Sequence, residues 1–500
     1  MAMANGQEKE IKLTSTKAAR KKFFQLPLVK EKILAGSPHT LKLWNQYLDT
    51  RDRKLSRTGM AYRIRRTNGK AFEATIKSRG ETVNGFSRRA EYTVPLEQAK
   101  PVLQGFAPQV DQKLQTLLQE DELLPLCTVE FTRKMALLQL SAVTVVEASV
   151  DMGTIRAGGK EALIGEIELE LKKGQERELL RFTAELAQAI PLLPEERSKF
   201  SRGLALLDGE TPKAKKKMAA PAWTEDTDPL GLWRSLAQKA AGTALDLLVP
   251  RMDEAFDAQG MLVTLRQLGG LWLVGKDFLS RTTWKKGKDL LAGLEEQLEP
   301  MAYLTGLSDA KAKPFPEELL SLEPGRKWLE DQWVAAAQKA AEACGKEVRA
   351  SLWQLLYLCT LAHKKTEVPA LGVLLQRQWN AWQQEEQLLA DAGNPDPWER
   401  KDQMEKLEGL LALTRGLGEK RLQKRGRAYE NQWWKHCLSY ARTGALEEGA
   451  EQVEDRELSI SLAALCGQEG LRTEKYRSRA WEAGKDFFKE VARHKEWSCL

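Results

Sequence analysis

The stretch Glu8-Lys9-Glu10-Ile11-Lys12 decides how this chain is interpreted. Side chains alternate between two faces along a β-strand, so Glu8, Glu10 and Lys12 share one face. A second acidic row with the same spacing lies far downstream, at residues 166–170. If strands that carry such rows close into one sheet, the inside of that sheet holds both acids and bases. Such an interior suits a metal ion and a polyanion better than it suits a dry core.

The bulk composition is that of a globular protein with more than one domain. The chain has 500 residues, of which 42% are hydrophobic and 29% charged, and this length exceeds what one ordinary core supports. Its 77 basic and 70 acidic residues give a net charge of +7, which permits an anionic ligand without requiring one. The six cysteines form no CxxC pair, which favours reduced thiols. With no signal peptide and no apolar run long enough for a membrane span, we expect a cytoplasmic protein that does not bind a membrane.

Two halves of the chain differ in pattern. Strand-like runs occupy residues 62–66, 72–77, 89–94, 129–138 and 143–150. The Asn68-Gly69 pair predicts a hairpin between the first two runs, and Met152-Gly153 and residues 157–159 are further turn signals. Helices are expected at 16–34, 114–123 and 175–190.

From about residue 229 onward, apolar residues recur at three- and four-residue spacing, which predicts a helical bundle. Pro and mixed charge at residues 209–228 are typical of a linker. The predicted organisation is therefore residues 1–208 as an α+β domain, 209–228 as the linker, and 229–500 as an all-α domain.

The alternating rows carry the chemistry of the first domain. Mg²⁺ prefers oxygen ligands, and carboxylates that face one cavity without a metal would repel one another. Basic residues alternate in the same way, with Arg63 and Arg65 on one strand and Lys77 and Arg89 on the next two. Arg forks match phosphate oxygens. The alternation of side chains along the strands leaves two interpretations open. The charged residues form either a structural ion-pair network or a triphosphate clamp with its metal.

An ordered series of motifs resembles the CYTH domains, also called triphosphate tunnel metalloenzymes. Residues 8–12 resemble their ExExK signature, and 59–65 resemble their "ALRIR" strand with Tyr62 in the Leu place. The remaining matches are Tyr47 to Thr50, Thr75 to Lys77, Arg89 to Glu91, Asp151 before a turn, 166–172 with the closing "EIELEL" strand, and Ser198-Lys199 with Arg202-Gly203. The resemblance covers about residues 6–207.

The resemblance implies an eight-stranded antiparallel β tunnel, with flanking helices, that binds a triphosphate group and Mg²⁺ or Mn²⁺. The implied metal ligands are Glu8, Glu10, Glu168, Glu170 and Glu166. The implied phosphate ligands are Lys12, Arg63, Arg65, Lys77, Arg89, Arg133 and Lys199, and Tyr47 and Asp151 are further candidates. The implied catalytic residues are Glu10, Lys12, Lys77 and Arg65.

The second half resembles a divergent CHAD domain, the helical domain that follows CYTH in some bacterial proteins. Arg266 is retained from its expected basic helix, and the chain has only four histidines. We therefore expect a hydrolase that splits inorganic triphosphate into phosphate and diphosphate, with polyphosphate as a further ligand. The alternatives are a hydrolase or cyclase that acts on thiamine triphosphate or ATP, with Phe72, Phe86 and Trp44 as stacking partners, and a non-catalytic polyphosphate-binding scaffold. The sequence indicates no specific nucleic acid and does not define a protein partner.

Overall fold

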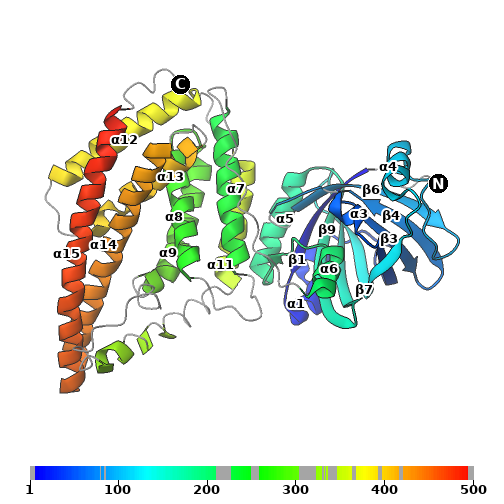
Figure 1. The fold of residues 1–500 in the computed structure, drawn as a ribbon, viewed down its shortest axis with the longest axis horizontal. Coiled ribbons are helices and arrows are strands. Elements are labelled where there is room, and N and C mark those ends of the chain that lie inside the picture. The colour runs from blue at the N-terminus through cyan, green and yellow to red at the C-terminus, as the bar shows by residue number, and fades with distance from the viewer. Residues whose placement is uncertain are drawn as a thin grey trace. The chain divides into compact units, whose positions relative to one another are not determined.

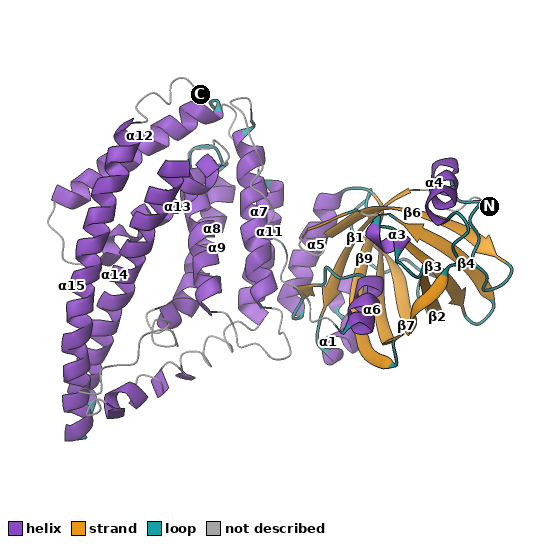
Figure 2. Ribbon diagram, viewed as in Figure 1, coloured by secondary structure: helices purple, strands orange, loops and turns teal. Residues whose placement is uncertain are grey.

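The computed structural model describes residues 6–78, 80–83, 86–209, 227–248, 258–302, 323–328, 331–332, 334–335, 346–362, 368–391, 397–415 and 420–493. The chain divides into two compact units, Met1–Lys217 and Met218–Leu500. The strands belong to the first unit, and the second is built of helices (Figure 1, Figure 2). Most of the predicted linker, residues 210–226, lies outside the described residues, and the exact domain boundaries stay a prediction.

The first unit is a closed antiparallel barrel. Its strands are β1 (Gly6–Thr14), β2 (His39–Asp49), β3 (Ala61–Thr67), β4 (Ala71–Lys77), β6 (Phe86–Leu96), β7 (Leu124–Gln139), β8 (Val145–Ala157) and β9 (Lys160–Lys173). They are hydrogen-bonded in the order β1-β9-β8-β7-β2-β3-β4-β6, and β6 pairs back with β1 to close the ring. The short strands β5 (Glu81–Val83) and β10 (Leu193–Pro194) pair with β6 and β1. The predicted eight-stranded antiparallel barrel is confirmed.

The Asn68-Gly69 hairpin between β3 and β4 is also confirmed. Both residues have positive φ angles, 50° and 76°, as the two central residues of a type I′ turn require. The turn fixes the register in which Arg63 faces Thr75 and Ala61 faces Lys77. The side chains predicted to share a face on these two strands therefore do so.

One turn prediction was wrong. Met152 and Gly153 lie inside β8, and so does Asp151, which was expected to precede a turn. A Cβ atom on Gly153 would approach the Glu130 carbonyl oxygen to 2.0 Å. Glycine is required at this position because β7 and β8 approach closely. The chain turns later, at Gly158 and Gly159.

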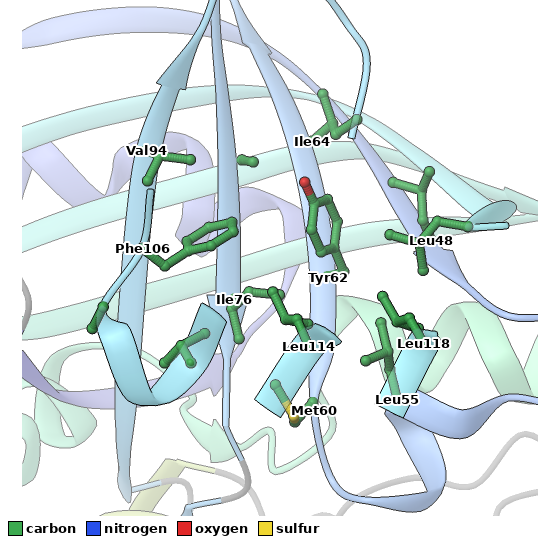
Figure 3. Packing of buried hydrophobic residues seen from close by; sticks show 14 residues of the cluster. Leu48, Leu55, Met60, Tyr62, Ile64, Ile76, Val94, Phe106, Leu114 and Leu118 are labelled. Atoms are coloured by element: carbon green, nitrogen blue, oxygen red, sulfur yellow. The ribbon is translucent and has the colours of Figure 1, made fainter. Parts of the chain in front are cut away.

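The apolar core of the barrel lies outside the ring of strands. On β3, Tyr62 and Ile64 are buried in a cluster with Leu114 of helix α4 (Pro108–Leu118) (Figure 3). Arg63 and Arg65, at the alternate positions of the strand, line the interior. The Tyr62 hydroxyl donates a hydrogen bond of 2.9 Å to the Val102 carbonyl. Because this outer face supplies the burial that stabilises the unit, the inner face is free to carry charge.

The other helices of this unit are α1 (Lys17–Lys22), the 3₁₀ turn η1 (Phe23–Gln25), α2 (Pro27–Lys30), α3 (Lys54–Arg57), α5 (Glu176–Ala189) and α6 (Lys199–Asp208). The helix expected at 16–34 is broken, because Leu26 precedes Pro27 and adopts an extended conformation. The helix expected at 114–123 is shifted: it begins at Pro108 and ends before Gln119, whose φ of 49° is not helical. Helix α5 lies where it was predicted.

The second unit contains α7 (Pro229–Leu247), α8 (Ala258–Gly275), α9 (Arg281–Ala302), α11 (Lys346–Leu361), α12 (Leu371–Asp391), η4 (Pro397–Arg400), α13 (Lys401–Thr414), α14 (Lys420–Gln452) and α15 (Arg456–Arg493). Four tryptophans are fully buried in this unit: Trp233, Trp272, Trp353 and Trp382. The predicted helical character of this half is confirmed. Across the described parts of both units, no helix combines the length and the apolar character needed to cross a membrane.

Candidate active site in the barrel

The barrel interior encloses a cavity of about 370 Å³ whose walls are charged. Seven carboxylates and eight cationic side chains line it. The carboxylates are Glu8, Glu10, Glu73, Glu91, Glu147, Glu168 and Glu170, and the cations are Lys12, Arg63, Arg65, Lys77, Arg89, Arg133, Lys172 and Lys199. Because acidic and basic side chains are nearly equal in number, their charges largely neutralise one another.

The row on β1 faces this cavity as the spacing predicted. Lys77 Nζ lies 2.9 Å from both carboxylate oxygens of Glu8, and Lys12 Nζ lies 2.9 Å from Glu10 Oε1. Arg89 approaches Glu8 to 3.8 Å and Glu10 to 3.7 Å. β1 can present the row to these partners because β6 and β9 flank it on either side.

The two carboxylates of this row differ in their protonation equilibria. Burial raises the pKa of Glu8 to about 7, against the opposing effect of Lys77. Burial would also raise the pKa of Glu10, but Lys12, Lys77 and Arg89 hold it below its usual value. Glu10 is 3% exposed, and its Oε1 accepts no hydrogen bond despite the nearby Lys12 ammonium. An ionised, buried carboxylate that is paired with an ammonium therefore lines the cavity.

A second group of contacts joins β3 to its neighbours. Arg63 donates a hydrogen bond of 2.9 Å to Thr75 Oγ1 and lies 3.4 Å from Glu91. Arg65 donates one of 3.0 Å to Asn45 Oδ1 and lies 3.5 Å from Glu73.

The basic groups are crowded at this part of the wall. Burial, together with the charges of Arg63 and Arg133, lowers the pKa of Arg65 to about 10. An anion beside Arg65 would therefore relieve the repulsion between its guanidinium group and those of Arg63 and Arg133.

Lys199, the first residue of α6, sits among three buried carboxylates. Its Nζ lies 2.8 Å from oxygens of Asp151, Glu166 and Glu168. We call these three residues the carboxylate triad. One oxygen from each lies within 4.8 Å of the others, a spacing that could hold a metal ion. The triad carboxylates raise the pKa of Lys199 well above its usual value, although burial opposes them.

Arg133 on β7 binds the same triad from another side. Its Nε and one terminal nitrogen donate hydrogen bonds of 2.8 and 2.7 Å to the two oxygens of Asp151, and it also pairs with Glu168. Burial alone would raise the pKa of Glu168, but Lys199 and Arg133 hold it well below its usual value.

The cavity thus gathers every phosphate ligand implied by the sequence, together with four of the five implied metal ligands. Glu170 pairs with Lys172 at 2.9 Å, and burial raises its pKa. Glu166 is the exception. It is 1% exposed, does not line the cavity, and contacts Lys199 and Arg202. Whether these residues form a functional site stays a prediction.

Sequence reasoning did not assign several lining residues, namely Asn45, Glu73, Glu91, Glu147, Ser149 and Lys172. The alternation rule would have found most of them. Glu73 lies two residues before Thr75, and Glu147 lies four before Asp151, on the same faces. Arg202, which pairs with Glu166, was noted only as part of a motif.

The proposed stacking partners do not line the cavity. Trp44 and Phe72 pack against the apolar cluster outside the barrel. Phe86 lies under the Arg88 guanidinium, 4.8 Å from its ring centroid. The aromatic side chains in the lining are instead Tyr47, Phe131 and Phe200.

The protein thus belongs to the class of closed antiparallel barrels that carry acids and bases on the inner face. Comparison with known proteins agrees with this class. Residues 6–204 match the family model described as the CYTH domain, so the resemblance is confirmed for the barrel unit. The match does not extend to the helical unit, for which the CHAD resemblance stays a prediction.

Among curated proteins, the chain is similar to an inorganic triphosphatase of Haemophilus influenzae, with 32% identity over 186 residues. The alignment covers 36% of this chain and 51% of that protein, so the chain spans about half the length of the curated relative it matches. A solved Hippeastrum protein described as having a dominant triphosphatase activity is 19% identical and covers 41% of this chain and 97% of its own, with a TM-score of 0.28. PptA from Streptomyces chartreusis is 12% identical and covers 51% and 98%, with a TM-score of 0.39.

Proposed function

We propose that the barrel is the active site of a divalent-metal-dependent hydrolase that splits inorganic triphosphate into phosphate and diphosphate. The observation that carries this proposal is the cavity itself, in which Lys12, Arg63, Arg65, Lys77, Arg89 and Arg133 converge beside a set of carboxylates. Guanidinium and ammonium groups in such an arrangement bind phosphate oxygens in several directions at once. The similarity of the barrel unit to an inorganic triphosphatase supports the same activity.

The balance of charges supports the metal requirement. Seven carboxylates line the same walls as the bases, so a triphosphate that enters alone would meet nearly as much negative as positive charge. A divalent cation removes this repulsion, and hard cations such as Mg²⁺ or Mn²⁺ prefer carboxylate oxygens. The Glu10 carboxylate, buried and kept ionised by Lys12 and its other cationic neighbours, fits that requirement. Glu8, Glu10, Glu168 and Glu170 would hold the ion, with Glu166 behind Lys199.

The roles of the side chains follow from their positions. Arg63, Arg65 and Arg133 would neutralise the phosphate chain and keep it extended, which orients the phosphorus atom for in-line attack by water. Lys77 and Arg89, now paired with Glu8, would turn to phosphate oxygens when substrate binds. A bound divalent ion lowers the pKa of water and polarises phosphate oxygens. The general base would be one of the cavity carboxylates.

The aromatic residues of the cavity favour an inorganic substrate over an organic one. Tyr47 stacks on Phe200, with ring centroids 5.2 Å apart and planes at 20°. The Phe131 ring lies under the charged groups of Arg133 and Lys199, at 5.8 and 5.2 Å. Each lining aromatic thus already contacts another side chain. A nucleobase or thiamine ring would have to displace one of these partners to stack.

The helical unit gives less support to a polyphosphate-binding scaffold. Arg266 stacks over Trp434 at 3.6 Å instead of facing an anion site. Among the bases at the start of α14, Arg427 pairs with Glu408, and Arg425 lies near Asp486 and Glu490. These bases are partly neutralised by acids of their own unit, as expected of a structural role.

The test is phosphate release from inorganic triphosphate, ATP and thiamine triphosphate, each with Mg²⁺, Mn²⁺ or EDTA. The proposal expects fast release from inorganic triphosphate that EDTA abolishes. Preference for an organic triphosphate would show that the proposed substrate is wrong, and the proposed metal site would still stand. Tight polyphosphate binding without release from any substrate would establish the scaffold instead.

A further inference from the structure

We propose that the outward face of helix α15, residues 456–475, binds a second copy of this chain in an antiparallel pair. In Figure 1, α15 lies at the edge of the helical unit, with α14 beside it. One side of α15 is buried, and Leu462, Leu465 and Phe487 on that side are at most 4% exposed. The proposal concerns the opposite, exposed side, so its failure would leave the proposed activity of the barrel untouched.

The middle of this outward face is apolar and open. Ile460 and Leu471 are 61% and 76% exposed, and they lie about three helical turns apart on the same side of α15. Gly467 lies between them, and a Cβ atom added to it would meet nothing within 4 Å. Scattered exposed apolar side chains need no explanation, but these residues form one strip with the exposed Ala463 and Ala464. Small side chains in the middle of such a strip allow a second helix to approach closely.

The charges at the two ends of the strip are complementary in an antiparallel pair. Arg456 and Glu457 lie at one end, Glu474 and Lys475 lie at the other, and all four are exposed. When two such faces are aligned antiparallel and centred at residues 465–466, Arg456 meets Glu474 of the second copy. Glu457 meets Lys475 of the second copy in the same alignment. Two-fold symmetry repeats each contact, and opposite charges beside an apolar seam set the orientation of paired helices.

The same alignment places Ile460 of one copy against Leu471 of the other, so the apolar residues match together with the charges. A parallel pair in register would instead set Arg456 against Arg456 and Glu457 against Glu457. Like charges at these positions would oppose association. The sequence of the face therefore favours the antiparallel pair.

These charges cannot satisfy one another within one chain. Glu457 and Lys475 belong to one continuous helix, and their separation along it is about 27 Å at 1.5 Å per residue. Within the part of the chain that the structure describes, Arg456, Glu457 and Lys475 form no ion pair, and Glu474 pairs with Arg477 one turn away. Three of the four charges are therefore available to a second copy.

The wider charge distribution favours the same arrangement. Residues 447–457 carry six carboxylates and one guanidinium group, whereas residues 472–485 carry five basic and two acidic side chains. An antiparallel pair brings the acidic stretch of one copy toward the basic stretch of the other. Such complementarity steers association and selects the partner.

The first test is the molar mass of the full chain, measured by sedimentation velocity over a range of protein concentrations at low and high salt. The proposal expects a monomer–dimer equilibrium that salt shifts toward the monomer, because exposed ion pairs are screened. A monomer at every concentration would overturn it.

A matched pair of leucine variants tests whether α15 is the surface used. Leu471→Asp should weaken the dimer about tenfold or more, since the seam would then bury two unpaired carboxylates. The control is Leu388→Asp on α12, where the leucine is 70% exposed, and it should leave the dimer unchanged. Equal losses in both variants would indicate nonspecific association, and no loss in Leu471→Asp would place the dimer on another surface. Either result overturns the proposal.

A charge swap tests the antiparallel alignment. Glu457→Lys alone, or Lys475→Glu alone, sets like charges against each other twice in the dimer and should weaken it roughly tenfold. The double variant should restore dimerisation, because each new lysine again meets a new glutamate. The two positions are too far apart to interact within one chain, so this rescue requires a second copy. Far-UV circular dichroism checks that the variants stay helical, and a double variant as weak as the single ones would overturn the proposed alignment.

Discussion

The two units differ in what sets the pKa values of their buried carboxylates. In the barrel, burial tends to raise the pKa of each acid and prevails at Glu8 and Glu170, but neighbouring cations prevail deeper in the network. Lys77 and Arg63 lower the pKa of Glu91 to about 2, and the pKa values of Glu10 and Glu168 are also below normal. These acids are ionised at neutral pH.

In the helical unit, burial prevails. It raises the pKa of Glu405 to about 8, with help from the charge of Glu295. It raises the pKa of Glu430 to about 9, where Glu408 adds both its charge and a hydrogen bond. These acids are largely protonated at neutral pH, and as neutral groups they are poor metal ligands. Burial alone therefore does not make a carboxylate a candidate metal ligand, whereas neighbouring cations keep Glu10 and Glu168 in the ionised form that a metal requires.

The largest expected effect comes from removing a cation inside the barrel. Arg133→Met leaves Asp151 and Glu168 buried with one partner fewer, and should lower the free energy of unfolding of the barrel by about 3–5 kcal/mol. Amide hydrogen exchange in β7 and β8 measures this change separately from the helical unit.

The control is Arg156→Met on the same pair of strands. Arg156 also contacts two carboxylates, Glu130 and Glu161, but all three side chains are about half exposed. Removal of the Arg156 guanidinium group should leave amide hydrogen exchange in β7 and β8 unchanged. Equal effects of the two variants would show that the buried network contributes no more than a surface one.

Glu10→Gln should lower turnover about 100-fold or more at saturating Mg²⁺, because a metal ligand contributes several kcal/mol to the transition state. The fold should be preserved, since the amide has the same shape. Steady-state phosphate release from triphosphate measures the effect, with Glu130→Gln on the outer face as the matched control. Turnover near that of the unchanged protein would remove Glu10 from the mechanism.

The helical unit should become less stable as pH rises. The folded-state pKa of Glu430 exceeds its unfolded value of 4.5, so its contribution is fully present below that pH and is lost as pH rises through about 9. Glu430→Gln should reduce the slope of unfolding free energy against pH by about 1.4 kcal/mol per pH unit between pH 6 and 8. Denaturant unfolding at several pH values tests this, and parallel curves for the two proteins would contradict it.

The smallest effect is expected at Lys9, which faces outward on β1. Its ammonium lies 2.9 Å from Glu176, and both side chains are about one-third exposed. Lys9→Ala should leave turnover within about twofold and change stability by less than about 1 kcal/mol. A large loss of turnover would place Lys9 in contact with the cavity and contradict the strand parity on which the site is built.

The sequence predicts well which face of a strand each side chain lies on, because this depends only on neighbouring residues. It placed Glu8, Glu10 and Lys12 on one face. What it could not give was the register between distant strands, which pairs Arg133 with Asp151 and Asp151 with Glu166. The carboxylate triad around Lys199 therefore came only with the structure.

The errors in the fold had two causes, a close tertiary contact in one case and misjudged local helix ends in the other. Gly153 resembles a turn residue, yet it allows two strands to touch. The helix near residue 114 was displaced because Pro108 and Gln119 set its ends. The Asn68-Gly69 turn was predicted correctly because a type I′ turn depends on those two residues alone.

Closure of the barrel has a consequence for how the chain folds as it is synthesised. β1 leaves the ribosome first, but its two partners are β6 and β9, and β9 ends at Lys173. Until then the strand with Glu8, Glu10 and Lys12 lacks its second neighbour, and the nascent sheet keeps open edges that invite aggregation. Contacts this distant in sequence also slow folding. The residues that begin the site are thus among the last to be fixed in place.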